Sequence, residues 1–247
     1  MRFMNKKLAV VVLAAGKGVR MESSLPKVVH EFNSVPMIER IIKTIKKLDP
    51  NKIITVVGYK KEIVKETITD KNIIFVEQKV QKGTGHAVLM SKSILSDFEG
   101  NIIVTPGDIP LLNSETLREL VKIHEKTNSA ATVLTTIMDD PQGYGRIIRD
   151  EDGFVIKIVE HKDASEQEKM IKEINTGIFC FDCKKLFQTL PLVTSDNAQN
   201  EIYLTDVLYI LRKHHKQIAA VKSDNQLEVT GINSKSQLAK LEKKVKK

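Results

Sequence analysis

A continuous apolar run at residues 8–13 leads directly into the small residues and glycines of positions 14–18. An uninterrupted apolar run is typical of a strand that a parallel sheet buries on both faces. The glycines that follow let the backbone approach a ligand closely and turn its N–H groups toward an anion. Two cations, Arg20 and Lys27, come next and fit no apolar helical pattern. The stretch predicts a polyphosphate site at a strand end; an ordinary turn with solvated charges is the alternative.

Two common phosphate-binding motifs do not match this stretch. The dinucleotide fingerprint requires a third glycine where Met21 stands, and the chain has no Gly-Lys-Ser/Thr sequence for a P-loop. The pattern that remains, L-A-A-G-x-G-x-R-M-x-S-x-x-P-K at residues 13–27, resembles the signature of the sugar-1-phosphate nucleotidyltransferases. The matching positions are Leu13, Ala14, Ala15, Gly16, Gly18, Arg20, Met21, Ser23, Pro26 and Lys27.

Length and composition are consistent with one large α/β domain. The chain has 247 residues, of which 41% are hydrophobic and 28% charged, as expected for a globular domain with a sizeable core. We expect a cytoplasmic protein, because no apolar run reaches the length of a membrane span and no signal-peptide pattern is visible. Most of the net charge of +8 lies in residues 234–247, which predict a solvated basic helix and no nucleic-acid partner.

Strand-like and helix-like patterns alternate through the first half of the chain. This alternation predicts a doubly wound, mainly parallel, Rossmann-like α/β sheet. Ser34 and Ser114 are the expected helix caps, with Pro36 in the first turn of the first helix. The expected strands are residues 8–13, 53–57, 73–77 and 101–105, and the expected helices are residues 36–48, 61–67, 87–95 and a segment from 114 onward.

The second half is expected to be mixed, with antiparallel strands added to the sheet. Residues 150–153 (Asp-Glu-Asp-Gly) form a hairpin signal between two apolar segments. We divide residues 1–233 into a nucleotide-binding half, about 1–128, and a sugar-binding half, about 129–233, over the carboxyl ends of the parallel strands. The expected strands are residues 130–137, 146–149, 154–159, 174–181 and 218–221, and the expected helix is residues 204–211.

Several polar positions stand where a ligand site is expected. Asp108 follows an apolar strand and is suited to hold Mg²⁺ together with substrate phosphates, although an Asp that starts a turn before Pro110 is equally plausible. The loop from Gln78 to His86 carries backbone and amide groups that can read a base, and His86 itself is interpreted as structural. Cys180 and Cys183 lack further ligands at zinc spacing and are interpreted as small hydrophobes.

Glycine, carboxylate and amide residues also recur in the second half. Gly145 lies in a Gly-Tyr-Gly-Arg sequence, Glu160 follows the predicted hairpin, and Asn175 opens the next strand. Each of them alone fits an ordinary turn. Together they supply the groups that recognise sugar hydroxyls and an acetamido group.

Eight blocks in order along almost the whole chain resemble the uridylyltransferase domain of the bacterial bifunctional UDP-N-acetylglucosamine pyrophosphorylases. This resemblance implies Mg²⁺-assisted transfer of a uridylyl group from UTP to N-acetylglucosamine 1-phosphate, a step toward peptidoglycan precursors and the cell wall. The blocks are LAAGKGVRMESSLPKVVH, QKGTGHAV, GDIPLL, GYGRI, IVEHKDAS, INTGIF, NAQNEIYLTD and GIN.

The resemblance also implies roles for individual residues. The nucleotide would contact Leu13, Ala14, Ala15, Gly16, Lys27 and Gly107, and its uracil would contact Gln78, Gly83 and Thr84. Arg20 and Lys27 would act on the polyphosphate, and Asp108 with Asn233 would hold the metal ion. Gly145, Glu160 and Asn175 would hold the sugar phosphate.

Departures from the family pattern are few. Val19 stands where a Thr is usual, Pro106 removes one backbone donor before Asp108, and Asn200 replaces a frequent Gly. The alternatives are an enzyme for another hexose 1-phosphate, such as glucose 1-phosphate, and a catalytically silent nucleotide-sugar binding protein. The bifunctional relatives continue into hexapeptide repeats, which this sequence does not show. We therefore expect no acetyl transfer, and a monomer or weak dimer.

Overall fold

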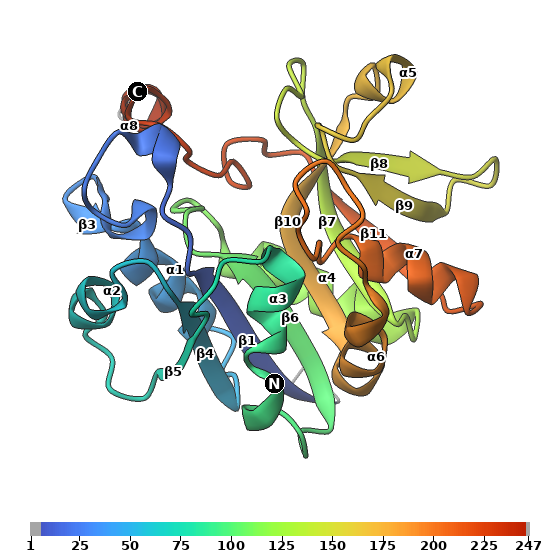
Figure 1. Ribbon diagram of the computed structural model, residues 1–247, viewed down its shortest axis with the longest axis horizontal. Helices are drawn as coiled ribbons and strands as arrows, with labels where there is room; N and C mark the ends of the chain where they lie inside the picture. The colour runs from blue at the N-terminus through green and yellow to red at the C-terminus, as the bar shows by residue number, and fades with distance from the viewer. Residues whose placement is uncertain (1–5, 246–247) are drawn as a thin grey trace.

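A nine-stranded mixed sheet forms the centre of the structure, a computed structural model that describes residues 6–245 (Figure 1). Its strands are β1 (Lys7–Ala14), β4 (Lys52–Val57), β5 (Ile74–Glu77), β6 (Gly100–Pro106), β7 (Ala131–Ile137), β8 (Arg146–Arg149), β9 (Val155–Val159), β10 (Glu173–Asp182) and β11 (Ile218–Ser223). The main path runs β11-β7-β10-β6-β1-β4-β5, and the β8–β9 hairpin joins it at β10. The expected mixed sheet, parallel in the first half and partly antiparallel in the second, is confirmed.

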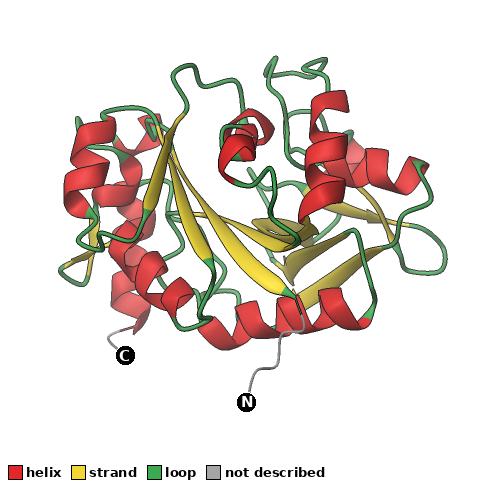
Figure 2. Ribbon diagram, turned by 90° about the horizontal axis from the view of Figure 1, so that it is seen from below, coloured by secondary structure: helices red, strands yellow, loops and turns green. Residues whose placement is uncertain are grey.

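Helices cover both faces of this sheet (Figure 2). The helices are α1 (Met37–Lys46), α2 (Lys61–Thr67), α3 (Thr84–Leu89), α4 (Ser114–Lys126), α5 (Glu166–Lys169), α6 (Cys183–Thr189), α7 (Asp206–Lys213) and α8 (Lys235–Val245), with short 3-10 turns η1 (Val19–Met21), η2 (Lys27–Val29), η3 (Lys92–Ile94) and η4 (Leu190–Leu192). Within residues 6–245, no helix has the length and apolarity that crossing a membrane requires.

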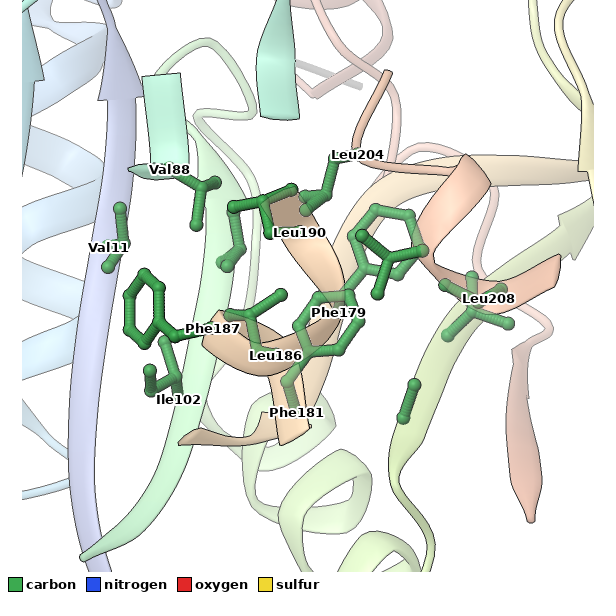
Figure 3. Packing of buried hydrophobic residues seen from close by; sticks show 14 of the residues in the cluster. Val11, Val88, Ile102, Phe179, Phe181, Leu186, Phe187, Leu190, Leu204 and Leu208 are labelled. Atoms are coloured by element: carbon green, nitrogen blue, oxygen red, sulfur yellow. The ribbon is translucent and has the colours of Figure 1, made fainter. Parts of the chain in front are cut away.

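The apolar strands bury both faces, which explains their continuous hydrophobic runs. Successive side chains of a strand point to opposite faces, so Val10 and Val12 pack with α1, α2 and α4 while Val11 packs with α3, α6 and α7. Figure 3 shows the second of these layers, in which Phe179 and Phe181 of β10 lie close to Leu186 of α6. Cys180 and Cys183 are free and buried, as their interpretation as small hydrophobes expects.

The antiparallel direction of β10 brings its first residues to the edge where the parallel strands end. β10 pairs with β6 through Phe179 opposite Val104, and the two strands run in opposite directions. A β-bulge interrupts the pairing of β10 with β7 between Asn175 and Phe179. Gly177 in this bulge has a φ of +80°, and a Cβ there would lie 3.1 Å from Pro106. The Asn175 segment is therefore held against the end of β6.

Three local predictions were wrong. Ser34 caps no helix; it lies with Asn33 in a two-residue turn between β2 (Glu31–Phe32) and β3 (Val35–Pro36). Both residues have positive φ, which is the geometry of a type I′ hairpin turn. Asn113, not Ser114, caps α4 and accepts a hydrogen bond from the backbone N–H of Glu115 at 3.1 Å.

The third wrong prediction concerns the helix expected at residues 87–95. α3 begins earlier, at Thr84, and ends at Leu89, and the chain then continues through the 3-10 turn η3. The expected basic helix at the C-terminal end is observed as α8, and positions 246 and 247 lie outside the described residues.

The helix α8 packs against the β2–β3 hairpin and the turn that carries Arg20. Leu241 of α8 is buried in a small cluster with Met21, Phe32 and Ile232. The carboxylate of Glu242 accepts a hydrogen bond from the backbone N–H of Asn33 at 2.7 Å. Figure 1 shows α8 beside β3. This contact anchors Met21, the residue next to Arg20.

We predict that Leu241→Ala lowers the free energy of unfolding by about 3 kcal/mol, because it leaves a cavity next to Met21. Val245→Ala is the matched control, since Val245 lies on the same helix and is 44% exposed. It should change stability by about 0.5 kcal/mol or less. Urea denaturation followed by circular dichroism measures both. Equal small effects for the two variants would show that α8 does not pack as described.

Candidate active site

The candidate site lies at the carboxyl ends of β1, β4 and β6, where open α/β sheets bind ligands. The carbonyl of Leu13, near the end of β1, accepts a hydrogen bond from the N–H of Gly107 at 3.0 Å. The carbonyl of Ala15 accepts one from the N–H of Tyr59, after β4, at 3.1 Å. These bonds fix the three strand ends relative to one another.

The glycine turn after β1 is shaped by close packing on Lys27. Gly18 has a φ of +69°, and a Cβ there would lie 2.5 Å from the Cβ of Lys27. A side chain at this position would displace the lysine. Gly16 is exposed, and a Cβ there would meet nothing within 4 Å, so its backbone is open to a ligand. Arg20 is exposed in η1, next to the buried Met21.

Lys27 meets Asp108 and Asn233, although the three residues are far apart in the sequence. Its ammonium forms an ion pair with Oδ2 of Asp108 and donates a hydrogen bond to Oδ1 of Asn233 at 2.9 Å. The backbone carbonyl of Asp108 accepts a hydrogen bond from the N–H of Ile232 at 3.0 Å, which aligns the two segments. Asp108 is only 5% exposed. We call these three residues the Lys27 cluster.

The oxygen donors of the Lys27 cluster fit a magnesium ion. Mg²⁺ usually takes one or two protein oxygens and completes its coordination with phosphates and water. Asp108 offers a carboxylate and Asn233 an amide oxygen, and both already contact a cation in the ammonium of Lys27. Residues 6–245 contain no group of three or more His, Cys, Asp or Glu arranged for a metal ion.

Gln78 organises the loop expected to read the base. The residue is 3% exposed, and its Nε2 donates a hydrogen bond to the carbonyl of Gly83 at 3.0 Å. The same Nε2 lies 2.9 Å from Nδ1 of His86. Because the amide nitrogen is used within the loop, any contact of Gln78 with a base must come from its oxygen.

His86 is held as a neutral imidazole. Burial, and secondly the positive charge of Lys82, lower the pKa of His86 below its ordinary value. The Nδ1 atom can then accept the hydrogen bond from Gln78, with the ring proton on Nε2. This agrees with the structural interpretation of His86, since the ring supports the loop.

Gly145, Glu160 and Asn175 also come together, and we call them the Glu160 cluster. A Cβ on Gly145 would lie 3.4 Å from both carboxylate oxygens of Glu160. The carbonyl of Gly145 accepts a hydrogen bond from the N–H of Asn175 at 2.9 Å, and the side chain of Asn175 accepts one from the N–H of Gly177 at 2.9 Å. A side chain at position 145 would therefore pack against the carboxylate of Glu160.

Three residues near these clusters were not assigned from the sequence. Thr205 donates a hydrogen bond to Oε1 of Glu160 at 3.2 Å. Burial raises the pKa of Glu160, while this hydrogen bond acts in the opposite direction. Burial also raises the pKa of Tyr144, with a further contribution from Asp108, so its phenol lies within electrostatic reach of that carboxylate.

The third such residue is Tyr203, which reaches the loop that follows Glu160. Its phenol donates a hydrogen bond to Oδ2 of Asp163 at 3.3 Å. Tyr144 stands between Gly143 and Gly145 in the Gly-Tyr-Gly-Arg sequence, and this was its only signal. Tyr203 and Thr205 lie in the NAQNEIYLTD block, but nothing in that block indicates which residues they contact.

A cation, a carboxylate and an amide thus meet at the carboxyl end of a doubly wound sheet, and a second polar cluster is formed by Gly145, Glu160 and Asn175. The sequence profile of the nucleotidyl transferase family matches residues 9–231. The chain therefore belongs to the nucleotidyl transferase family.

Curated relatives and a solved structure agree with this assignment. Over 232 residues, 94% of the chain, it is 45% identical to the bifunctional protein GlmU of Streptococcus pyogenes. It is 46% identical over 233 residues to the bifunctional protein GlmU of Streptococcus mutans. The chain spans about half the length of these relatives, 50% in both cases.

The fold is shared with a crystal structure of UDP-glucose pyrophosphorylase complexed with UDP-glucose. The TM-score is 0.77, with 97% of this chain and 98% of the other covered. The sequences are only 17% identical, so the likeness concerns the fold alone.

We call residues 78–86 the base loop, after the role expected for them, and we predict that Gly83→Ala opens this loop. Gly83 has a φ of +100°, and a Cβ there would lie 2.6 Å from the carbonyl oxygen of Ile202. Hydrogen exchange at the amides of Gly85 and Ile202, followed by mass spectrometry, should become roughly tenfold faster or more, given about 1–3 kcal/mol of strain.

Gly153→Ala is the matched control for this prediction. Gly153 has a similar φ of +83°, but a Cβ there would meet nothing within 4 Å. The control should leave exchange at the base loop unchanged. Unaltered exchange in Gly83→Ala as well would mean that the close approach to Ile202 does not hold the loop.

Proposed function

We propose that the chain transfers a uridylyl group from UTP to N-acetylglucosamine 1-phosphate, giving UDP-N-acetylglucosamine and pyrophosphate. The observation that carries the proposal is the meeting of Lys27, Asp108 and Asn233 at the carboxyl edge of the sheet. A cation beside two oxygen donors suits a polyphosphate with its metal ion. The Glu160 cluster and the 45% identity to GlmU proteins support an amino-sugar substrate.

The two substrates would divide the chain between them. We propose that residues up to about 128 bind the nucleotide and that residues 129–233 bind the sugar phosphate. Uracil presents an N3–H donor, and the buried Gln78 offers an amide oxygen as a matching acceptor. Gly83 and Thr84 adjoin it in the same loop, and the phosphates would follow the backbone of residues 13–16 and Gly107.

In the proposed reaction, an oxygen of the sugar phosphate attacks the α-phosphorus of UTP in line with the leaving group. A phosphorus–oxygen bond forms, the bond from the α-phosphorus to the bridging oxygen breaks, and its electron pair leaves with pyrophosphate. A phosphate monoester is already a nucleophile near neutral pH, so no protein base is required. Arg20 and Lys27 would align the two anions and neutralise the charge that develops. The anomeric configuration is retained, because the C1–O bond stays intact.

Asp108 and Asn233 would hold the metal ion, for which we propose Mg²⁺. Mg²⁺ bound there would supply positive charge to the phosphate oxygens. The ion pair of Lys27 with Asp108 keeps the ammonium at the place where these phosphates would bind. We also propose that the chain works in the cytoplasm as a monomer or weak dimer, without nucleic acid or membrane as partners.

Pyrophosphate release across four nucleoside triphosphates and several sugar 1-phosphates, with Mg²⁺ present, tests the proposal. We expect UTP with N-acetylglucosamine 1-phosphate to be the best pair. UTP should exceed CTP by roughly 100-fold or more, because cytosine leaves buried hydrogen-bonding groups unpaired. Faster release with glucose 1-phosphate would favour a hexose enzyme instead. Tight binding of a UDP-sugar without any release would favour a silent binding protein.

Asp108→Asn should lower turnover roughly 100-fold, because one charged oxygen is lost from the proposed metal site. Asp196→Asn is a matched control on an exposed residue and should retain wild-type turnover. Turnover is measured at saturating Mg²⁺ after circular dichroism has shown that both variants are folded. A folded Asp108→Asn enzyme with near wild-type turnover would remove Asp108 from the metal site.

A further inference from the structure

Residues 197–206, which we call the bridging segment, pair directly with the loop proposed to read the base. The N–H of Gly85 donates a hydrogen bond to the carbonyl of Ile202 at 2.8 Å, and the N–H of Ile202 donates one to the carbonyl of Lys82 at 2.8 Å. The N–H of Leu204 donates to the hydroxyl of Thr84 at 3.1 Å. The loop and the segment are therefore joined by three hydrogen bonds.

The two backbones lie too close together to move independently. A Cβ on Gly85 would approach both the carbonyl oxygen and the side chain of Ile202 to 2.9 Å. Gly83 is equally crowded, by Glu201 as well as Ile202. Regions packed this closely have low compressibility and transmit strain. A change in the position of the base loop is therefore transmitted to residues 201 and 202.

The other side of the bridging segment contacts Glu160, the carboxylate proposed to bind the sugar phosphate. Thr205 donates its hydroxyl to Glu160, as described above. Asp163 binds the segment twice, because its Oδ1 accepts from the N–H of Ala198 at 2.8 Å and its Oδ2 accepts from Tyr203. The N–H of Asp163 in turn donates to the carbonyl of Glu160 at 2.9 Å. Glu160 is thus tied to the segment through Thr205 and through Asp163.

Tyr203 lies between these two sets of contacts. Its backbone neighbours on either side, Ile202 and Leu204, bind the base loop, while its phenol reaches Asp163. The residue is 6% exposed, and its phenol oxygen also accepts a hydrogen bond from Nε2 of Gln199 at 2.8 Å. Burial, more than any other effect, raises the pKa of Tyr203 to about 12, so the phenol remains a donor at neutral pH.

We propose that Tyr203 is a positioning residue that couples the nucleotide site to the sugar-phosphate site through the bridging segment. The identities of the two ligands rest on the function proposed above. A ligand that orders the base loop also orders Glu160, so the second ligand meets a partly organised site. Each ligand should then raise the affinity of the other by the same factor, about 5-fold or more.

Calorimetry on the full chain measures this factor directly. The probe is α,β-methylene UTP, whose α–β linkage resists cleavage, titrated with Mg²⁺ in the absence and presence of saturating N-acetylglucosamine 1-phosphate. We expect the wild-type ratio of the two dissociation constants to be about 5 or more. In Tyr203→Phe, which removes only the hydroxyl, we expect this ratio to fall toward 1.

Two further variants separate coupling from a merely structural effect. Tyr209→Phe makes the same chemical change on α7 at a residue that is 41% exposed, and it should keep the wild-type ratio. Asp163→Asn weakens the same contact from its other partner and should lower the ratio, and the double variant should lower it no further than Tyr203→Phe alone. A uniform loss of affinity changes both dissociation constants and leaves their ratio unaltered.

The outcomes distinguish this inference from the proposed function. If both ligands bind wild type but the ratio is 1, or if Tyr203→Phe keeps the wild-type ratio, the coupling role of Tyr203 is overturned and the proposed function stands. If wild type binds neither ligand, both are overturned. A reduced ratio in Tyr203→Phe and Asp163→Asn, with Tyr209→Phe unchanged, supports the inference.

Discussion

The ammonium of Lys27 joins three parts of the chain that are separated by as many as 206 positions. It contacts the carboxylate of Asp108 at the end of β6 and the amide oxygen of Asn233 just before α8. The surrounding glycines leave room for these contacts, because Gly18 packs directly on Lys27 and Gly231 lies beside Asp108. Three polar groups that are costly to bury alone are thereby mutually satisfied. A polyphosphate with its metal ion would meet a site whose charges are already in position.

The direction of β10 is the second constraint on the site. In a fully parallel sheet, Asn175 would lie at the amino edge, far from the end of β6. Because β10 runs antiparallel, Asn175 and Gly177 reach the carboxyl edge, and the bulge between Asn175 and Phe179 turns this segment toward Pro106. The Glu160 cluster is thus built from segments that the parallel half of the sheet does not contain. This arrangement would allow the two proposed substrate regions to adjoin at one edge of the sheet.

Local signals predicted elements well where hydrophobic periodicity was strong and less well where turn chemistry decided the outcome. Residues 61–67 were expected to be helical and are α2. Ser34 is a residue type that often caps helices. Here both Asn33 and Ser34 adopt positive φ, so the pair forms a hairpin turn. Asn113, which precedes Ser114, occupies the cap position of α4, and its side-chain oxygen accepts the hydrogen bond from the N–H of Glu115. Which of two neighbouring residues caps a helix or forms a turn depends on tertiary packing, which the local sequence does not show.

By itself, the sequence determined the alternation of strands and helices, the glycine turn after β1 and the residue types of the site, because each follows from local periodicity or from a short motif. Only the tertiary structure decided which of these residues meet. The pairing of Lys27 with Asn233 and the hydrogen bond from Tyr203 to Asp163 both join distant segments. No local pattern encodes such contacts, because they arise from strand order and from packing at the carboxyl edge of the sheet.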